Sequence, residues 1–221
     1  PGEEPSPGPD EAAGVDAGDL ASHPIGTTPE RLQELGARLI GNYLVNLSGT
    51  EVSDADLAIL ADRPGLKRLL LADTAITDNG LDRLAELDNL ESLVLTNTRI
   101  TDAGIEKLAE LERLGELDLA GTAVTDAGLE QLVEIKNLKS VSVARTAVTD
   151  AGVKHLAACK LLTVVRLDRT KVGDAGVELL KPLVGLEEIG LAGTAVTDAG
   201  LVHLKERPSL RRLDLSDLGI A

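Results

Sequence analysis

Apolar residues recur with a period of 24 from Leu66 to the end of the chain, without insertion or deletion, and residues 42–65 form a degenerate unit before them. Within each unit they occupy positions 1, 4, 6, 11, 16 and 19, and usually 22. The first three mark a short strand, and the last three have the spacing of one helix face. Each unit therefore predicts a strand followed by a short helix. The units begin at residues 42, 66, 90, 114, 138, 162, 186 and 210, which makes about 7.5 repeats because the last is incomplete.

A single unit cannot bury its apolar face alone, so neighbouring units must stack. The pattern predicts one solenoid over residues 42–221. Residues 29–41 follow a helical pattern, with Leu32, Leu35, Leu39 and Ile40 on one face, and predict an N-terminal capping helix. No equivalent follows the last strand, which predicts either a truncated chain or self-association through residues 210–221.

Polar residues also recur at fixed positions of the unit. A threonine at position 9 is expected to satisfy backbone groups after the strand, where an unpaired buried amide would cost about 1–3 kcal/mol. Threonine at position 12 is expected to cap the helix, and aspartate at position 13 to favour the helix N-terminus. Glycine at position 15 indicates a close backbone approach between neighbouring helical segments. We expect these columns to be structural, not a calcium or ice-binding array.

The repeated motif has the form LxxLxLxxT followed by segments such as ITDAGI and VTDAGL. It resembles the leucine-rich repeat, in particular the cysteine-containing class known from F-box proteins and from bacterial repeat proteins. The resemblance covers residues 42–221. It implies an α/β fold, a right-handed horseshoe solenoid with a concave parallel sheet and short convex helices. It does not imply any one function, because the family is defined by a scaffold.

Composition removes several classes of function. The net charge is −15, which argues against nucleic-acid or anionic-membrane partners because phosphate binding needs a basic surface. No apolar stretch reaches the roughly 18 residues needed to span a bilayer. Phosphate loops, metal-ligand clusters and nucleophile motifs are missing from the sequence, and its one cysteine, Cys159, cannot form an internal disulfide. We therefore expect a non-enzymatic protein without cofactor or metal.

The first 28 residues hold six acidic residues, five prolines and five glycines but no lysine or arginine. This composition predicts a disordered tail or linker over residues 1–28 and leaves a charge of −9 for the remainder. The tail resembles the spacer that follows an export signal or anchor in bacterial repeat proteins. We accordingly expect placement in the bacterial cell envelope or secretion, with a cytoplasmic protein as the alternative.

Candidate partner-binding residues lie at the variable positions 3, 5 and 7, which face the concave side in this fold, and at position 8 on its edge. Leu70 and Val94 predict an apolar patch, while Arg145, Arg166, Arg169 and Lys171 predict a basic island in an acidic protein. Arginine suits a carboxylate-bearing partner. The competing interpretation is that Asp168, Glu187 and Glu188 neutralise the island as ordinary surface pairs.

The sequence therefore predicts a protein-protein interaction module that presents its concave sheet to a macromolecular partner. One alternative is an intracellular adaptor or substrate-receptor subunit, although residues 1–41 offer one short helix where an F-box needs several. Another alternative is a structural spacer attached to a missing catalytic domain.

Overall fold

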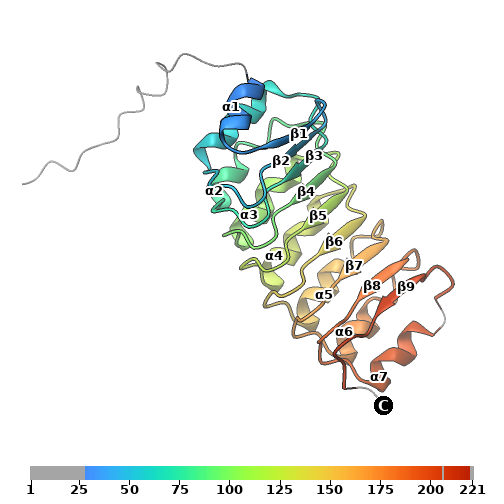
Figure 1. Cartoon of the computed structure of the whole chain (residues 1–221). Helices are drawn as coiled ribbons and strands as arrows, with labels where there is room; N and C mark the ends of the chain where they lie inside the picture. The colour runs from blue at the N-terminus through green and yellow to red at the C-terminus, as the bar shows by residue number, and fades with distance from the viewer. Residues whose placement is uncertain (1–27, 206, 220–221) are drawn as a thin grey trace, which may run out of the picture.

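The computed structural model describes residues 28–205 and 207–219, so nearly all of the predicted tail lies outside the described residues. Within these residues nine strands form one sheet in the order β1 to β9, and each strand from β2 to β8 pairs in parallel with the strand one repeat later (Figure 1). Partners in neighbouring strands are 24 residues apart, as in Val45, Leu69 and Leu93. The strands are β2 (Leu44–Asn46), β3 (Arg68–Leu70), β4 (Ser92–Val94), β5 (Glu116–Asp118), β6 (Ser140–Ser142), β7 (Val164–Arg166), β8 (Glu188–Gly190) and β9 (Arg212–Asp214).

A row of short helices covers the other side of the solenoid (Figure 1). Most α-helices begin at the aspartate of position 13, and short 3-10 segments occur on the same side in the part of the chain that the structure describes. The α-helices of the repeats are α2 (Asp78–Leu81), α3 (Asp102–Lys107), α4 (Asp126–Gln131), α5 (Asp150–Leu156), α6 (Asp174–Leu179) and α7 (Asp198–Leu201). The 3-10 segments are η2 (Ala55–Asp62), η3 (Leu108–Glu110), η4 (Leu132–Glu134) and η5 (Val202–Leu204). The predicted leucine-rich-repeat solenoid is confirmed.

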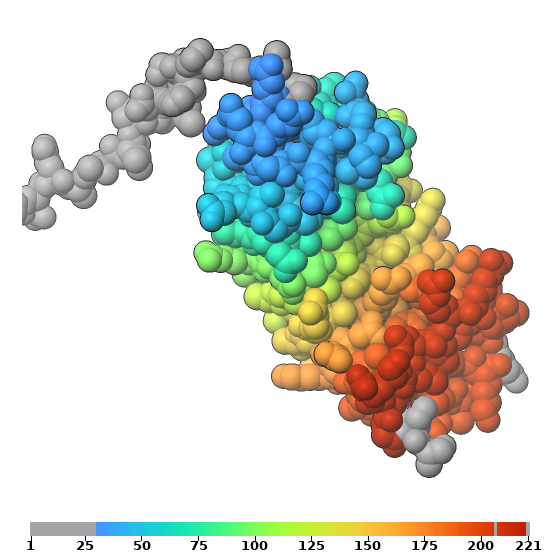
Figure 2. Space-filling view, viewed as in Figure 1, coloured from blue at the N-terminus to red at the C-terminus, as the bar shows by residue number. Residues whose placement is uncertain are grey.

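The core is a stack of nearly identical aliphatic layers between the sheet and the helices. In the central repeats Leu117 of the strand and Leu119 just after it pack in one core with Leu129 and Leu132 from the helical side, all at most 2% exposed. Successive repeats appear as stacked bands in the space-filling view (Figure 2). Because every layer has the same shape, leucine, valine and isoleucine fill the space that aromatic rings occupy in irregular cores.

The N-terminal cap differs from the single helix expected over residues 29–41. Helix α1 spans only Thr28–Glu34, and strand β1 (Arg38–Ile40) follows it and pairs antiparallel with β2. Gly36 is the physical reason, because its φ of +82° ends the helix and the Ala37 N–H donates to the carbonyl of Leu32 at 2.9 Å. Ile40 is consequently on a strand and 52% exposed, not on a buried helix face.

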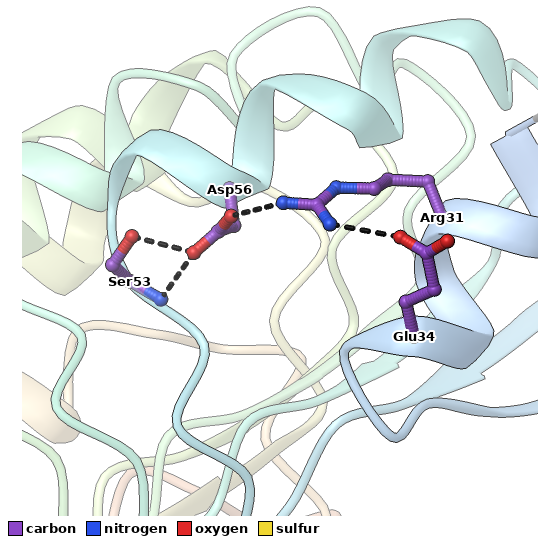
Figure 3. A network of polar contacts seen from close by, with 4 residues as sticks. All are labelled: Arg31, Glu34, Ser53 and Asp56. Carbon is purple, nitrogen blue, oxygen red and sulfur yellow. Dashed lines mark hydrogen bonds and ion pairs between the residues drawn. The ribbon is translucent and has the colours of Figure 1, made fainter. Parts of the chain in front are cut away.

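Polar side chains connect α1 to the first repeat (Figure 3). Arg31 contacts Glu34 of its own helix at 2.9 Å and Asp56 of η2 at 3.8 Å. The same Asp56 accepts bonds from the amide and hydroxyl of Ser53 at 3.0 and 2.6 Å. Leu32, the residue after Arg31, is fully buried. Exposed ion pairs contribute at most about 1 kcal/mol, so burial of Leu32 holds the cap and the polar network orients it.

The position 9 threonines have the structural role predicted for them. Each hydroxyl donates to the carbonyl three residues earlier, at 2.6–2.7 Å. In five of these repeats the same carbonyl also accepts the backbone amide of the threonine at 3.2–3.3 Å, so the hydroxyl adds a second bond that closes the turn after the strand. The set is Thr50, Thr74, Thr98, Thr122, Thr146, Thr170 and Thr194.

The position 13 aspartates bind the next repeat. Asp126 accepts the amide of Thr149 at 2.8 Å with one oxygen and the Thr149 hydroxyl at 2.7 Å with the other. The hydroxyl of Thr149 also accepts the amide of Ala151 at 3.2 Å, which is the predicted helix cap. Four other aspartates accept the same two bonds from the threonine of the next repeat: Asp54 from Thr77, Asp78 from Thr101, Asp102 from Thr125 and Asp174 from Thr197. We call this column the aspartate-threonine ladder.

The ladder also explains the glycine at position 15. A Cβ on Gly152 would collide with the carboxylate of Asp126 and lie 2.9 Å from a Leu129 methyl. Gly80, Gly104, Gly128, Gly176 and Gly200 face the aspartate of the preceding repeat in the same way. The close approach predicted from the sequence is therefore between glycine and a carboxylate, not between two backbones.

One step of the ladder is incomplete, and its repair is expected to stabilise the protein. Gly173 stands where other repeats have threonine, so Asp150 receives only an amide bond at 2.7 Å. Gly173 already has the extended backbone of the capping threonines, and a Cβ there meets nothing closer than 3.7 Å. We expect Gly173→Thr to raise the free energy of unfolding by about 1–2 kcal/mol. Thermal unfolding checks this, and a lower melting temperature would contradict the role given to the hydroxyl.

Candidate protein-interaction surface

The concave face carries the side chains at positions 3 and 5 of each repeat, which are the first and last residues of each strand. The side chain at position 4 points into the core. Position 3 contributes Leu44, Arg68, Ser92, Glu116, Ser140, Val164, Glu188 and Arg212. Position 5 contributes Asn46, Leu70, Val94, Asp118, Ser142, Arg166, Gly190 and Asp214. These positions differ from repeat to repeat, whereas the core and ladder positions are nearly constant. The variation lies on one continuous surface.

A shallow depression crosses the middle strands of this face. Ser92 and Ser142 lie within it and are 5% and 8% exposed, with Glu116 and Asp118 beside them. Asp118 accepts the amide of Ala120 at 2.9 Å and so is partly engaged by its own turn. Small side chains here allow a partner to approach the sheet closely.

Arg166 is held by the carboxylate of Glu188 at the C-terminal part of the face. Its Nε and Nη2 atoms donate to one oxygen of Glu188 at 2.9 and 2.6 Å, while Arg212 donates to the other oxygen at 2.6 Å. Burial raises the pKa of Glu188, but the bonds and charges of Arg166 and Arg212 outweigh it and hold the pKa below its ordinary value. Glu188 thus neutralises Arg166, as the competing interpretation of the basic island expected.

Arg145 and Arg169 lie in the turns that follow β6 and β7, at position 8. Arg145 reaches Asn97 two repeats earlier, with 3.4 Å between Nη2 and Oδ1, and Arg169 reaches Asp217 two repeats later at 3.3 Å. The Arg169 side chain lies against the position 8 glycine of the next repeat, since a Cβ on Gly193 would lie 3.1 Å from Arg169 Cγ. The two guanidinium groups therefore extend away from each other along the edge of the sheet, and both side chains are exposed.

The backbone at Arg145 and Arg169 is unfavourable for arginine. Their φ angles are +58° and +56°, in the left-handed region. Other repeats place glycine, asparagine or aspartate at this position, which tolerate that region. Arginine has no local compensation and incurs a cost of about 1–2 kcal/mol. Retained local strain of this kind is a reason to look for a function of the side chain.

This strain gives a direct stability prediction. We expect Arg145→Asn and Arg169→Asn each to raise the free energy of unfolding by about 0.5–1 kcal/mol, or roughly 1–4 °C in Tm, because asparagine adopts positive φ more readily. Differential scanning calorimetry of the two variants checks it. A matched control is Lys154→Asn, on the exposed surface of α5, where we expect a small loss because asparagine is a weaker helix former. Lower stability in the turn variants would show that the arginines are not strained.

The six residues predicted from the sequence form two groups in the structure. Leu70 and Val94 are register neighbours in β3 and β4, and both are half-buried. Arg145, Arg166, Arg169 and Lys171 cluster around β6 and β7. Lys171 follows β7, where its backbone bridges to Thr149 and its side chain is exposed.

The acidic neighbours that were expected to neutralise the island do so unequally. Glu188 contacts Arg166, whereas Asp168 is directed toward the next repeat and accepts the amide of Ala192 at 2.9 Å, across Gly190. Within the described residues no carboxylate pairs with Arg145 or Lys171. Those two cations and the weakly paired Arg169 are the part of the island open to a partner.

Sequence reasoning missed the exposed residues of the cap hairpin, Ile40 and Tyr43, because residues 29–41 were interpreted as one helix. The glycines at 36 and 41, both with positive φ, were the signal that could have identified a strand between them. In the described part of the chain no group of three His, Cys, Asp or Glu side chains could hold a metal. The helices described there are all too short or too polar to cross a membrane.

Comparisons with known proteins agree with the fold. The leucine-rich repeat family matches residues 88–109. A comparison with curated proteins found no match. Among solved structures, an internalin from Listeria monocytogenes matches 83% of this chain at 22% identity with a TM-score of 0.57, and this chain spans 55% of it. Internalin C2 from the same species matches 78% of this chain at 26% identity with a TM-score of 0.60, and this chain spans 80% of it.

Proposed function

We propose that this chain, a leucine-rich repeat protein similar to bacterial leucine-rich repeat proteins, is a non-enzymatic module that binds another protein through its concave sheet and the adjoining edge. The fold supports a protein-interaction module in general. The observation that carries the specific proposal is the pair Arg145 and Arg169, which occupy left-handed positions at a cost to stability.

The chemistry of the edge indicates the kind of group it receives. Arg145, Arg169 and Lys171 are exposed cations in a protein of net charge −15. Guanidinium groups bind carboxylates with paired hydrogen bonds, so an acidic segment of a partner is the suited ligand. Arg166 contributes if the partner carboxylate shares it with Glu188, and Leu70 with Val94 supplies apolar contact farther along the face.

The compartment is part of the same proposal. Its support is the acidic, proline- and glycine-rich composition of residues 1–28 together with the structural likeness to bacterial internalins. We place the protein in the bacterial cell envelope or outside the cell. Fractionation of the source organism tests this, and recovery of the protein in the cytosolic fraction alone would contradict it.

Partner capture from a native lysate of the source organism tests the function. The variant Arg145→Ser/Arg166→Ser/Arg169→Ser removes three cations from the concave side and edge. The matched control Arg83→Ser/Lys154→Ser/Lys205→Ser removes three exposed cations from the helical side, with the same change in net charge. We expect the first variant to lose a partner that the wild type and the control both capture. Unchanged capture by the first variant would contradict the proposal.

A further inference from the structure

The single tyrosine of the chain lies on the surface. The sequence contains no phenylalanine or tryptophan, yet Tyr43 is 47% exposed, and nearby Ile40 is 52% exposed. Both belong to the hairpin that joins β1 to β2. Gly41, at the turn with φ of +54°, sits against the ring, since a Cβ there would lie 3.4 Å from two ring carbons. The one large amphipathic side chain is therefore presented to solvent in a defined place.

The antiparallel strand β1 extends the concave face beyond the first repeat. Ile40 pairs with Leu44, which pairs with Arg68, and Arg38 pairs with Asn46, which pairs with Leu70. Val45 is fully buried and Leu39 packs against the core, so the residues on either side of them face the concave side. The outward positions of β1, β2 and β3 thus hold three aliphatic residues, two arginines and one asparagine.

The two ends of the concave face differ in charge. The outward positions of β1 to β4 hold two arginines and no acidic residue, whereas those of β5 to β9 hold four acidic residues and two arginines. Arg68 has a single distant ion pair, 3.9 Å to Glu116, and Arg38 has none within the described residues. The N-terminal end of the concave face is accordingly basic and apolar in an acidic protein.

We propose that Arg38, Ile40, Tyr43, Leu44, Arg68 and Leu70, the cap-side patch, form an anchoring site for a partner segment that carries both aliphatic side chains and carboxylates. Tyrosine and arginine are the residue types enriched at interface hot spots. The two arginines select carboxylates by charge, and the aliphatic residues between them select apolar side chains. The inference rests on the proposed function because both use the concave face, but it involves different residues.

Tyr43 supplies its own assay, because it is the sole tyrosine in a chain without tryptophan. The probe is a short synthetic peptide of alternating leucine and glutamate, added to the whole protein while Tyr43 emission and its quenching by acrylamide are recorded. We expect saturable protection of Tyr43. Peptides of leucine with lysine, and of serine with glutamate, should protect it weakly or not at all. Equal protection by the lysine peptide, or none by the glutamate peptide, would overturn the inference.

Variants identify the site of binding. Ile40→Ser and Arg68→Ser should each lower the affinity for the leucine-glutamate peptide at least about fivefold. Val184→Ser, at a side chain that is 79% exposed far along the solenoid, is the matched control and should bind as the wild type does. All three positions are exposed, so folding is expected to survive each change. Wild-type affinity in both Ile40→Ser and Arg68→Ser would overturn the inference.

The two experiments distinguish failure of the cap-side patch from failure of the proposed function. If Tyr43 does not respond while the Arg145/Arg166/Arg169 variant loses its captured partner, the cap-side patch is refuted and the proposed function stands. If that variant keeps every partner while Ile40→Ser abolishes the Tyr43 response, the arginine edge is refuted and the cap-side patch stands.

Discussion

Replacing Gly152 with alanine is expected to destabilise the fold by about 2–4 kcal/mol, although it adds only one methyl group. The new Cβ would overlap the Asp126 carboxylate and approach Leu129 at 2.9 Å. To relieve the overlap, Asp126 must move away from Thr149 and release two hydrogen bonds of 2.8 and 2.7 Å. A tightly packed repeat offers no free volume for that movement.

Urea denaturation of Gly152→Ala checks this expectation. The matched control is Gly185→Ala, because a Cβ on Gly185 meets nothing within 4 Å. The control should change the free energy of unfolding by no more than about 1 kcal/mol, in the stabilising direction because alanine reduces the entropy of the unfolded chain. Equal effects at both glycines would contradict the collision with Asp126.

Removal of the aspartate itself should have a comparable effect. Asp126→Ala deletes both bonds to the following repeat and leaves the Thr149 amide without an acceptor. We therefore expect the free energy of unfolding to fall by about 2–4 kcal/mol. Glu130→Ala, in the same helix at an exposed position, is the control and should stay within about 0.5 kcal/mol of wild type. Chemical denaturation of both variants measures the difference. A small effect at Asp126 would show that the ladder orders the repeats without stabilising them.

Much of the scaffold follows from the sequence because each layer of the solenoid repeats the same packing problem. The strand at positions 3 to 5, the helix after position 12 and the inward threonines are local consequences of spacing and capping. The partner of Asp126 is not local, since it lies 23 residues away in the next repeat. The helix dipole explained an aspartate at that position, but only the stacked geometry shows that the carboxylate fills the space left by the next glycine.

The candidate site was predictable in part for the same reason. Position in the repeat places Leu70, Val94 and Arg166 on the concave face and Arg145 on its edge. The sequence offered three carboxylates near the arginines but could not show that Glu188 binds Arg166 while Asp168 binds an amide of the next repeat. It also could not separate Arg145 and Arg169 from ordinary surface arginines. Their positive φ angles are set by the turn, and only the backbone reveals them.

The polar residues of the repeats therefore fall into two groups, those that recur at a fixed position and those that depart from the repeat. The aspartate of the ladder accepts two bonds from the threonine of the next repeat, and the glycine of that repeat leaves room for the carboxylate, so these residues need no ligand to explain them. Arg145 and Arg169 depart from the repeat at a position where departure is unfavourable. We infer that partner binding is the reason they are arginine.

The most direct test is partner capture by the double variant Arg145→Asn/Arg169→Asn, at a temperature where both it and the wild type are folded. Asparagine keeps the turn and removes the two guanidinium groups. The account predicts that the captured partner is lost while Tm stays equal to or above that of the wild type. Undiminished capture by a fully folded double variant would contradict it.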